Sequence, residues 1–183
     1  MSSRAPRRAV QRLERRQRQQ RRWVLRGIGI LALLVLGGLA YRTLTKESPG
    51  RAVPTIGNQH VASMETPHVP YNTRPPTSGP HLPSIARWGI HTQPIPDELQ
   101  MHNLEDGGVL VHYNCRDCDA VIAKLEAIVS RYSDKVILAP YPQMDTRIAL
   151  TAWGRIDTFD AVDEQRIVRF IQAYRGIDHH PRQ

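Results

Sequence analysis

The spacing of apolar and polar residues is regular mainly in the second half of the chain, where it predicts alternating strands and helices. The predicted strands cover residues 107–113, 135–139 and 147–154, and the predicted helices cover residues 119–132 and 163–175. Gly176 follows the second helix in the position of a C-terminal cap. The predicted order is β-α-β-β-α, an α+β domain with helices on one side of a small mixed sheet, compatible with a trimmed thioredoxin-like fold.

A different pattern, apolar on every side, covers residues 23–42 near the N-terminus. Arg26 is the one charged residue between Trp23 and Tyr41, and a length of about 20 residues suits a helix that crosses a bilayer. Many basic residues precede the stretch and few follow it, so the positive-inside rule predicts a cytoplasmic N-terminus and an extracytoplasmic domain at a bacterial inner membrane. A cleaved signal peptide is the alternative, because Gly38-Leu-Ala40 has small residues at the right spacing.

The excess of positive over negative charge lies in the N-terminal region. The formal net charge is +8, yet the whole excess precedes residue 48 and the remaining chain is slightly acidic. A nucleic-acid-binding domain is therefore not expected. Residues 1–22 are interpreted as a cytoplasmic tail that sets topology and contacts anionic lipid headgroups.

The middle of the chain is rich in proline. Residues 43–66 show no sustained period and predict a tether, whereas the extracytoplasmic domain is expected to cover residues 67–178. Proline excludes helix between residues 70 and 96. Tyrosine, tryptophan and histidine residues alternate with the prolines there, so we expect an ordered loop that wraps the domain and supplies side chains to a site.

The two cysteines form the motif Cys115-Arg-Asp-Cys118, directly after a predicted strand and at the start of a predicted helix. This is the position of a thioredoxin-like redox pair, in which the helix N-terminus lowers the pKa of the first thiol. Asp117 and Asp119 oppose that effect. Three interpretations stay open: a redox pair with Cys115 attacking and Cys118 resolving, a metal-binding pair, and an inert disulfide.

Histidine and acidic residues offer a second candidate chemistry. His102 and Glu105 are three residues apart, so a helical turn places both on one side. Together with nearby imidazole and sulfur donors they predict a metal site, for copper before zinc. The candidate ligands are His81, His102, Glu105, Asp106, His112 and Met144, with Cys115 and Cys118 as further thiolate donors. The alternative is that His102 and Glu105 only hydrogen-bond the proline-rich loop.

Three motifs resemble a bacterial family of membrane-anchored proteins, domain-of-unknown-function family 3105. They are Pro75-Pro-Thr-Ser-Gly-Pro-His81, His102-Asn-Leu-Glu105 and Leu150-Thr-Ala-Trp-Gly-Arg155, and the resemblance covers roughly residues 58–176. It implies an extracytoplasmic domain behind one N-terminal helix, with no established activity. Asp106 stands where the family usually has a second histidine, and the cysteine motif is not a general family feature, so His81, His102 and Glu105 would be the shared site.

Three functions follow as hypotheses. The first is a metal-binding module, and a non-enzymatic protein is expected. The second is an accessory subunit of a membrane protein complex, whose proline-rich loop and apolar helix contact partner proteins as well as the lipid bilayer. The third is a tethered thiol-disulfide oxidoreductase that uses Cys115 and Cys118.

Overall fold

The computed structural model describes residues 21, 23, 25–38, 48–115 and 118–180. The chain divides into two compact units, Met1–Glu47 and Ser48–Gln183, and each is described by itself. The predicted basic tail lies almost entirely outside the described residues.

In the N-terminal unit, residues 25–38 form a helix whose side chains are exposed. Within the described residues, no helix combines the length and the apolar character that a bilayer crossing requires. The prediction of a membrane-spanning helix over residues 23–42 is therefore wrong, and with it the predicted single-pass topology and inner-membrane location.

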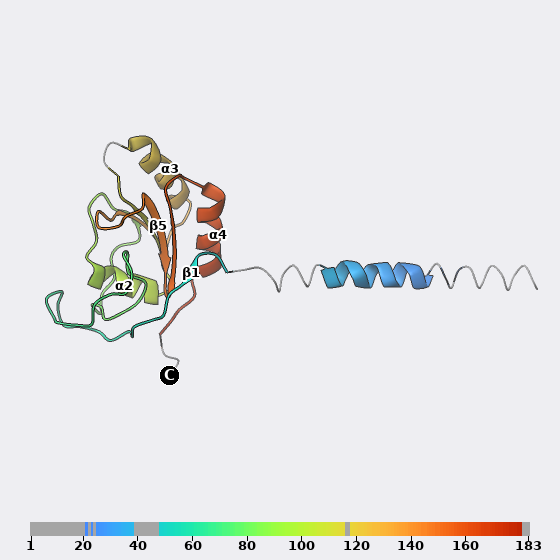
Figure 1. Cartoon of the computed structure of the whole chain (residues 1–183), viewed down its shortest axis with the longest axis horizontal. Helices are drawn as coiled ribbons and strands as arrows, with labels where there is room; N and C mark the ends of the chain where they lie inside the picture. The colour runs from blue at the N-terminus through green and yellow to red at the C-terminus, as the bar shows by residue number, and fades with distance from the viewer. Residues whose placement is uncertain (1–20, 22, 24, 39–47, 116–117, 181–183) are drawn as a thin grey trace, which may run out of the picture. The chain divides into compact units, whose positions relative to one another are not determined.

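The described part of the second unit contains a six-stranded mixed sheet in the order β1-β6-β5-β3-β4-β2 (Figure 1). The strands are β1 (Arg51–Ala52), β2 (Gly89–Ile90), β3 (Val109–Tyr113), β4 (Val136–Pro140), β5 (Ile148–Ala152) and β6 (Arg155–Phe159). The helices are α2 (Asp97–Glu105), α3 (Asp119–Val129) and α4 (Glu164–Tyr174). Strand β4 is parallel to β3 and β2, whereas β5 is antiparallel to β3 and β6. The predicted α+β class is confirmed.

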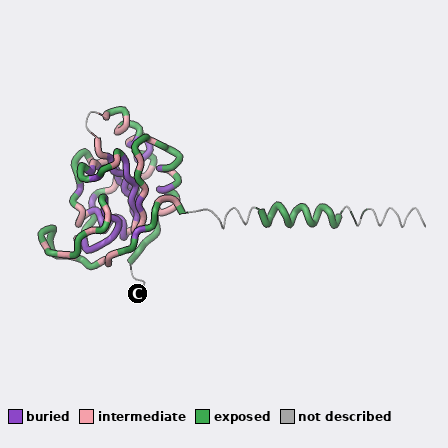
Figure 2. Tube along the Cα trace, in the orientation of Figure 1, coloured by how far each residue is buried: buried purple, intermediate pink, exposed green. Residues whose placement is uncertain are grey.

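One face of the sheet is covered by α3 and α4, the two helices that the apolar spacing predicts. Leu125 of α3 and Phe170 of α4 are fully buried against Val111 and Leu138 of the central strands. Buried stretches of the chain gather in the interior of the domain, with exposed stretches around them (Figure 2). Because successive strand residues alternate between faces, Leu110 and His112 of β3 point the other way.

The opposite face is covered by α2 and by the proline-rich segment. Met101 and Leu104 of α2 pack with Leu110, Ile137 and, from the proline-rich segment, Ile95. Sequence analysis anticipates only the last turn of α2, because few of its residues are apolar and no amphipathic stripe results. Its buried positions include the polar side chains of Gln100, Asn103 and Glu105, of which Glu105 belongs to the candidate site.

The third predicted strand, residues 147–154, is in fact β5 and the turn that follows it. Gly154 has a φ of +65°, a conformation that favours glycine, and the chain reverses there into β6. Strand β6 was not predicted because only Ile156 is buried in its middle. Residues 48–66 also belong to this unit, since Val53 is buried and its N–H donates to the Gly154 carbonyl at 2.9 Å.

Candidate metal site

Three separate segments bring histidine and glutamate side chains together beside α2. His102 and Glu105 project from the last turn of α2, as their spacing predicts. His81 ends the buried run of the proline-rich segment, and its backbone pairs with that of His60. The Val61 N–H donates to the His81 carbonyl at 2.8 Å, so the two histidine-bearing segments are held side by side.

The four side chains His60, His81, His102 and Glu105 are close enough to share one ion, and we call them the inner set. Each offers one ligand atom, and these atoms all lie within 4.8 Å of one another. The three imidazole rings lie with their centroids 5.1 Å apart in every pairing. The set is asymmetric in burial, since His81 and Glu105 are inaccessible to solvent and His60 is exposed.

Two of the imidazoles are oriented by backbone carbonyl groups. His81 Nδ1 lies 2.7 Å from the Gly79 carbonyl oxygen, and His102 Nδ1 lies 2.9 Å from that of Leu82. A carbonyl only accepts, so Nδ1 carries the hydrogen in both rings and Nε2 of each neutral ring keeps its lone pair. Metal-binding histidines in proteins almost always have this arrangement.

Glu105 is held in a way that leaves one carboxylate oxygen for the site. Asn58 Nδ2 donates to Glu105 Oε1 at 2.7 Å, and Glu105 Oε2 lies 2.9 Å from His81 Nε2. If His81 is neutral and Glu105 ionised, both atoms of this second contact are acceptors. Burial lowers the pKa of His81, because desolvation outweighs its bond to Gly79 and the charge of Glu105. The buried contact therefore calls for a cation between imidazole and carboxylate, either a proton or a metal ion.

The proline-rich segment is fixed in place around His81. Gly79 has a φ of +135°, and a Cβ there would lie 2.8 Å from the Tyr71 ring. Tyr71 donates its hydroxyl hydrogen to the Pro80 carbonyl at 2.7 Å, and the Leu82 N–H donates to the Glu98 carbonyl of α2 at 2.8 Å. His81 is thus positioned by backbone contacts on both sides.

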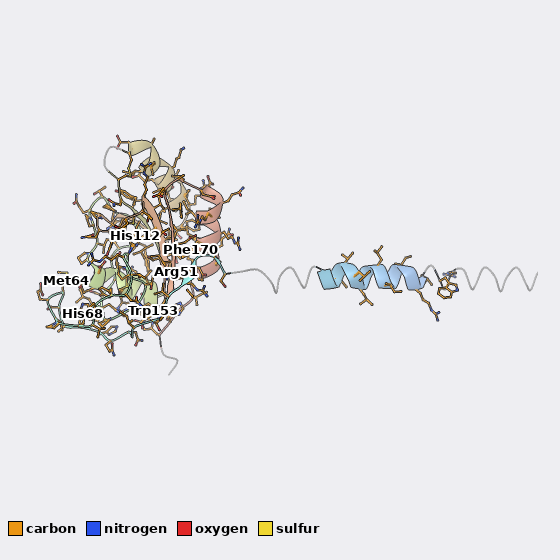
Figure 3. The ribbon with its side chains drawn as sticks, viewed as in Figure 1. Arg51, Met64, His68, His112, Trp153 and Phe170 are labelled. Atoms are coloured by element: carbon orange, nitrogen blue, oxygen red, sulfur yellow. A yellow bond between two sulfur atoms is a disulfide. The ribbon has the colours of Figure 1, made fainter. Side chains whose placement is uncertain are left out.

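Trp153 borders the same site on the side of the β5–β6 turn. Its ring centroid lies 6.1 Å from that of His81 in an edge-on arrangement, and the ring stacks on His179 at 6.0 Å. Figure 3 labels Trp153 at the end of the domain and His112 within the sheet. Trp153 is thus an aromatic neighbour of both His81 and His179.

The other predicted ligands lie elsewhere or at the edge of this set. Asp106 Oδ1 lies 3.9 Å from His102 Nε2, at the rim. His112 is buried in β3, where Nε2 lies 3.2 Å from Thr151 Oγ1 and Nδ1 has no hydrogen-bond partner among the described residues. Met144 packs with Tyr141 and Ala149.

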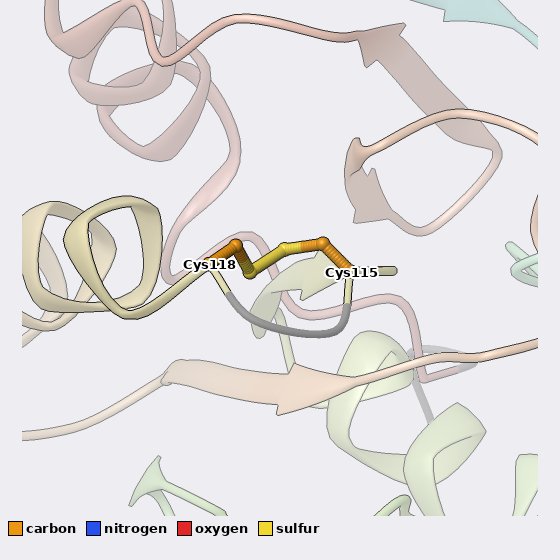
Figure 4. Close-up of a disulfide and its surroundings, with 2 residues drawn as sticks. All are labelled: Cys115 and Cys118. Atoms are coloured by element: carbon orange, nitrogen blue, oxygen red, sulfur yellow. A yellow bond between two sulfur atoms is a disulfide. The ribbon is translucent and has the colours of Figure 1, made fainter.

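Cys115 and Cys118 form a disulfide, with their Cα atoms 6.0 Å apart (Figure 4). Cys115 follows β3 after one residue and packs against the core, and Cys118 is the N-cap residue of α3. In this state the two sulfur atoms offer no thiolate to a metal ion. The predicted position at a strand-to-helix junction is confirmed.

Sequence analysis missed two histidines near the site, His60 and His180. His60 lies in the segment interpreted as a tether, and His180 lies beyond the last predicted element. His180 Nε2 is 3.4 Å from Glu105 Oε2. Neither residue belongs to a motif with regular spacing. The one signal in the sequence is that both are histidines, in a chain that has eight.

Fold and site together define an α+β domain with a buried histidine–glutamate cluster at the end of one helix. The chain belongs to the family described as "Protein of unknown function (DUF3105)", whose sequence model matches residues 60–183. The resemblance drawn from the three motifs is thus confirmed. No curated protein and no solved structure matches the chain.

Proposed function

We propose that this protein is a metal-binding domain that holds one Zn²⁺ ion on His60, His81, His102 and Glu105. The observation that carries the proposal is the contact of 2.9 Å between His81 Nε2 and Glu105 Oε2. The His81 Nδ1–H already donates to the Gly79 carbonyl, so in the neutral ring Nε2 carries no hydrogen for the carboxylate. A metal ion between these atoms converts an acceptor–acceptor contact into two coordinate bonds.

The dimensions of the inner set suit a tetrahedral ion after a small contraction. Bonds of about 2.0–2.1 Å to nitrogen and oxygen place tetrahedral ligand atoms about 3.4 Å apart. The present atoms lie within 4.8 Å of one another, and the His81–Glu105 contact is already shorter than that spacing. The exposed His60 is the ligand that can move most freely to complete the coordination.

The donor types support zinc over the copper that sequence analysis placed first. That order depended on sulfur donors from Met144 and the cysteines. Met144 packs in a different cluster and the cysteines are joined in a disulfide, so the inner set contains nitrogen and oxygen donors only. Zinc accepts three imidazoles and one carboxylate readily.

The full chain, stripped with a chelator and dialysed against Zn²⁺, is expected to retain about one ion per chain by elemental analysis. His102→Ala removes an oriented ligand and is expected to lower the content below about a tenth of an ion. His91→Ala is the matched control, because His91 Nε2 bonds the Arg87 carbonyl and the ring is outside the inner set. Equal zinc content in the wild type and His102→Ala, with native circular dichroism in both, would overturn the proposal.

A second candidate function, thiol–disulfide exchange, is favoured by the surroundings of the Cys115–Cys118 disulfide. The pair joins β3 to α3 in a parallel β3–α3–β4 unit, the context in which a Cys-x-x-Cys pair is typically redox-active. A substrate thiolate would attack one sulfur and break the S–S bond to form a mixed disulfide. The second substrate thiol would then displace the protein, which leaves with two thiols while the substrate leaves oxidised.

Equilibration of the full chain with glutathione buffers tests this activity. A redox pair is expected to show a potential of about −270 mV or higher, whereas a structural disulfide lies below about −300 mV. Under exchange, Cys118→Ser should accumulate a mixed disulfide through Cys115 because the resolving thiol is missing. A potential in the structural range, without adduct in that variant, would exclude the activity.

A further inference from the structure

The segment that follows α4, residues 176–180, returns to the end of α2, and we call it the strap. The Gly176 N–H donates to the Gly107 carbonyl at 2.7 Å, and the His179 N–H donates to the Glu105 carbonyl at 2.9 Å. Gly107 has a φ of +78°, and a Cβ there would lie 2.6 Å from the strap backbone. The strap is thus seated on the residues that carry the metal site.

The strap brings His180 to a second group of ligand atoms, the outer set. His180, His102 and Asp106 offer ligand atoms that lie within 4.8 Å of one another. Asp106 Oδ1 lies between the two histidines, at 3.8 Å from His180 Nδ1 and 3.9 Å from His102 Nε2. His180 Nδ1 also lies 2.8 Å from Asp178 Oδ1, so Nε2 is the ring nitrogen that His180 offers to an ion. The His180 side chain is 38% exposed, whereas that of Glu105 is 1% exposed, so an ion from solvent can reach His180 directly but cannot reach Glu105 directly.

Inner and outer sets share His102 and cannot both use it. His102 Nδ1 is bonded to the Leu82 carbonyl, so the ring has one nitrogen, Nε2, for a metal ion. The two sets also approach each other at a second point, because His180 Nε2 of the outer set lies 3.4 Å from Glu105 Oε2 of the inner set. An ion held by His102 and His180 therefore needs only a short displacement to reach Glu105 and His81.

We infer that His180 is a transient ligand and that His180, His102 and Asp106 form an outer position through which Zn²⁺ passes to and from the inner set. The inference rests on the proposed function and adds the route of exchange. The buried ligands His81 and Glu105 bind the ion in its final position. The exposed His180 replaces part of the hydration shell of the ion before the ion reaches them.

A transient ligand has a kinetic signature that a permanent ligand lacks. Removal of a ligand that binds the ion only while it enters or leaves the inner set slows association and dissociation by the same factor. The dissociation constant is then unchanged. Loss of a permanent ligand speeds dissociation and weakens binding. The two roles are therefore separated by measuring both rates.

The test uses the full chain and Zn²⁺ with a chromophoric chelator in stopped flow. His180→Ala is expected to slow zinc uptake and release about tenfold each, with the dissociation constant unchanged within about twofold. Asp106→Asn should act in the same direction, since it removes the charge between the two histidines. His91→Ala, which removes a histidine outside both sets, should keep the wild-type rates.

The failure of this inference is distinct from failure of the proposed function. If the wild type binds no zinc, the proposed function fails and the inference fails with it. If the wild type binds one ion and His180→Ala exchanges it at wild-type rates, only the inference is overturned. Faster release with weaker binding in His180→Ala also overturns it, because His180 is then a resident ligand.

Discussion

Glu105→Gln is expected to weaken zinc binding by about 100-fold, or about 2.7 kcal/mol, without destabilising the metal-free domain. The amide removes the negative charge and the carboxylate ligand. Its oxygen can still accept from Asn58, and its N–H₂ group can donate to His81 Nε2, where the carboxylate presents a second acceptor. Isothermal titration with Zn²⁺ measures the affinity, and urea unfolding without metal measures the stability.

The control for this variant is Glu98→Gln on the same helix. Glu98 Oε1 lies 3.4 Å from His68 Nε2 and belongs to neither ligand set, so its substitution should leave zinc affinity unchanged. A metal-free Glu105→Gln protein that unfolds at much lower urea than the wild type would mean that the charged His81–Glu105 contact stabilises the domain by itself, as a proton-bridged pair. A metal site would then not be needed to explain the contact.

The second large effect concerns His112 and the dependence of stability on pH. Burial lowers the pKa of His112 to about 3, because the ring is enclosed in the sheet. Between pH 6.5 and pH 3 the unfolded chain binds a proton at this residue and the folded chain does not. The free energy of unfolding is therefore expected to fall by about 1.4 kcal/mol for each pH unit below about 6, as the contribution of this residue.

The measurement compares urea unfolding of the metal-free wild type and His112→Gln between pH 4 and pH 8. Glutamine keeps a polar group that can reach Thr151 and does not titrate, so the two stability curves should converge as pH is lowered. His91→Gln, at a surface position, should retain the wild-type slope. Parallel curves for wild type and His112→Gln would show that residue 112 does not couple folding to protonation in this range.

Local patterns predicted two amphipathic helices and the two central strands, which are buried along nearly their whole length. Apolar spacing predicted helices over residues 119–132 and 163–175 and strands over residues 107–113 and 135–139, and the structure has α3, α4, β3 and β4 there. Helix α2 was not predicted apart from its last turn, because its buried positions mix polar with apolar side chains. The turn at Gly154 was not predicted, because a single glycine after Trp153 is compatible both with a turn and with a longer strand.

The N-terminal stretch shows the limit of composition. A run of apolar residues predicted a membrane-spanning helix over residues 23–42, yet among the described residues no helix meets the length and hydropathy that such a span needs. Apolar composition by itself does not establish a membrane-crossing helix.

The sequence by itself named three of the four inner-set residues as candidates, His81, His102 and Glu105. His102 and Glu105 share a helical face because their separation of three residues is close to one helical turn. Only the tertiary structure added His60 and His180 and placed His81 beside α2. Backbone pairing between residues 60 and 81 and the return of the strap to α2 join segments far apart in the chain, and such contacts depend on the packing of the whole domain rather than on any local period.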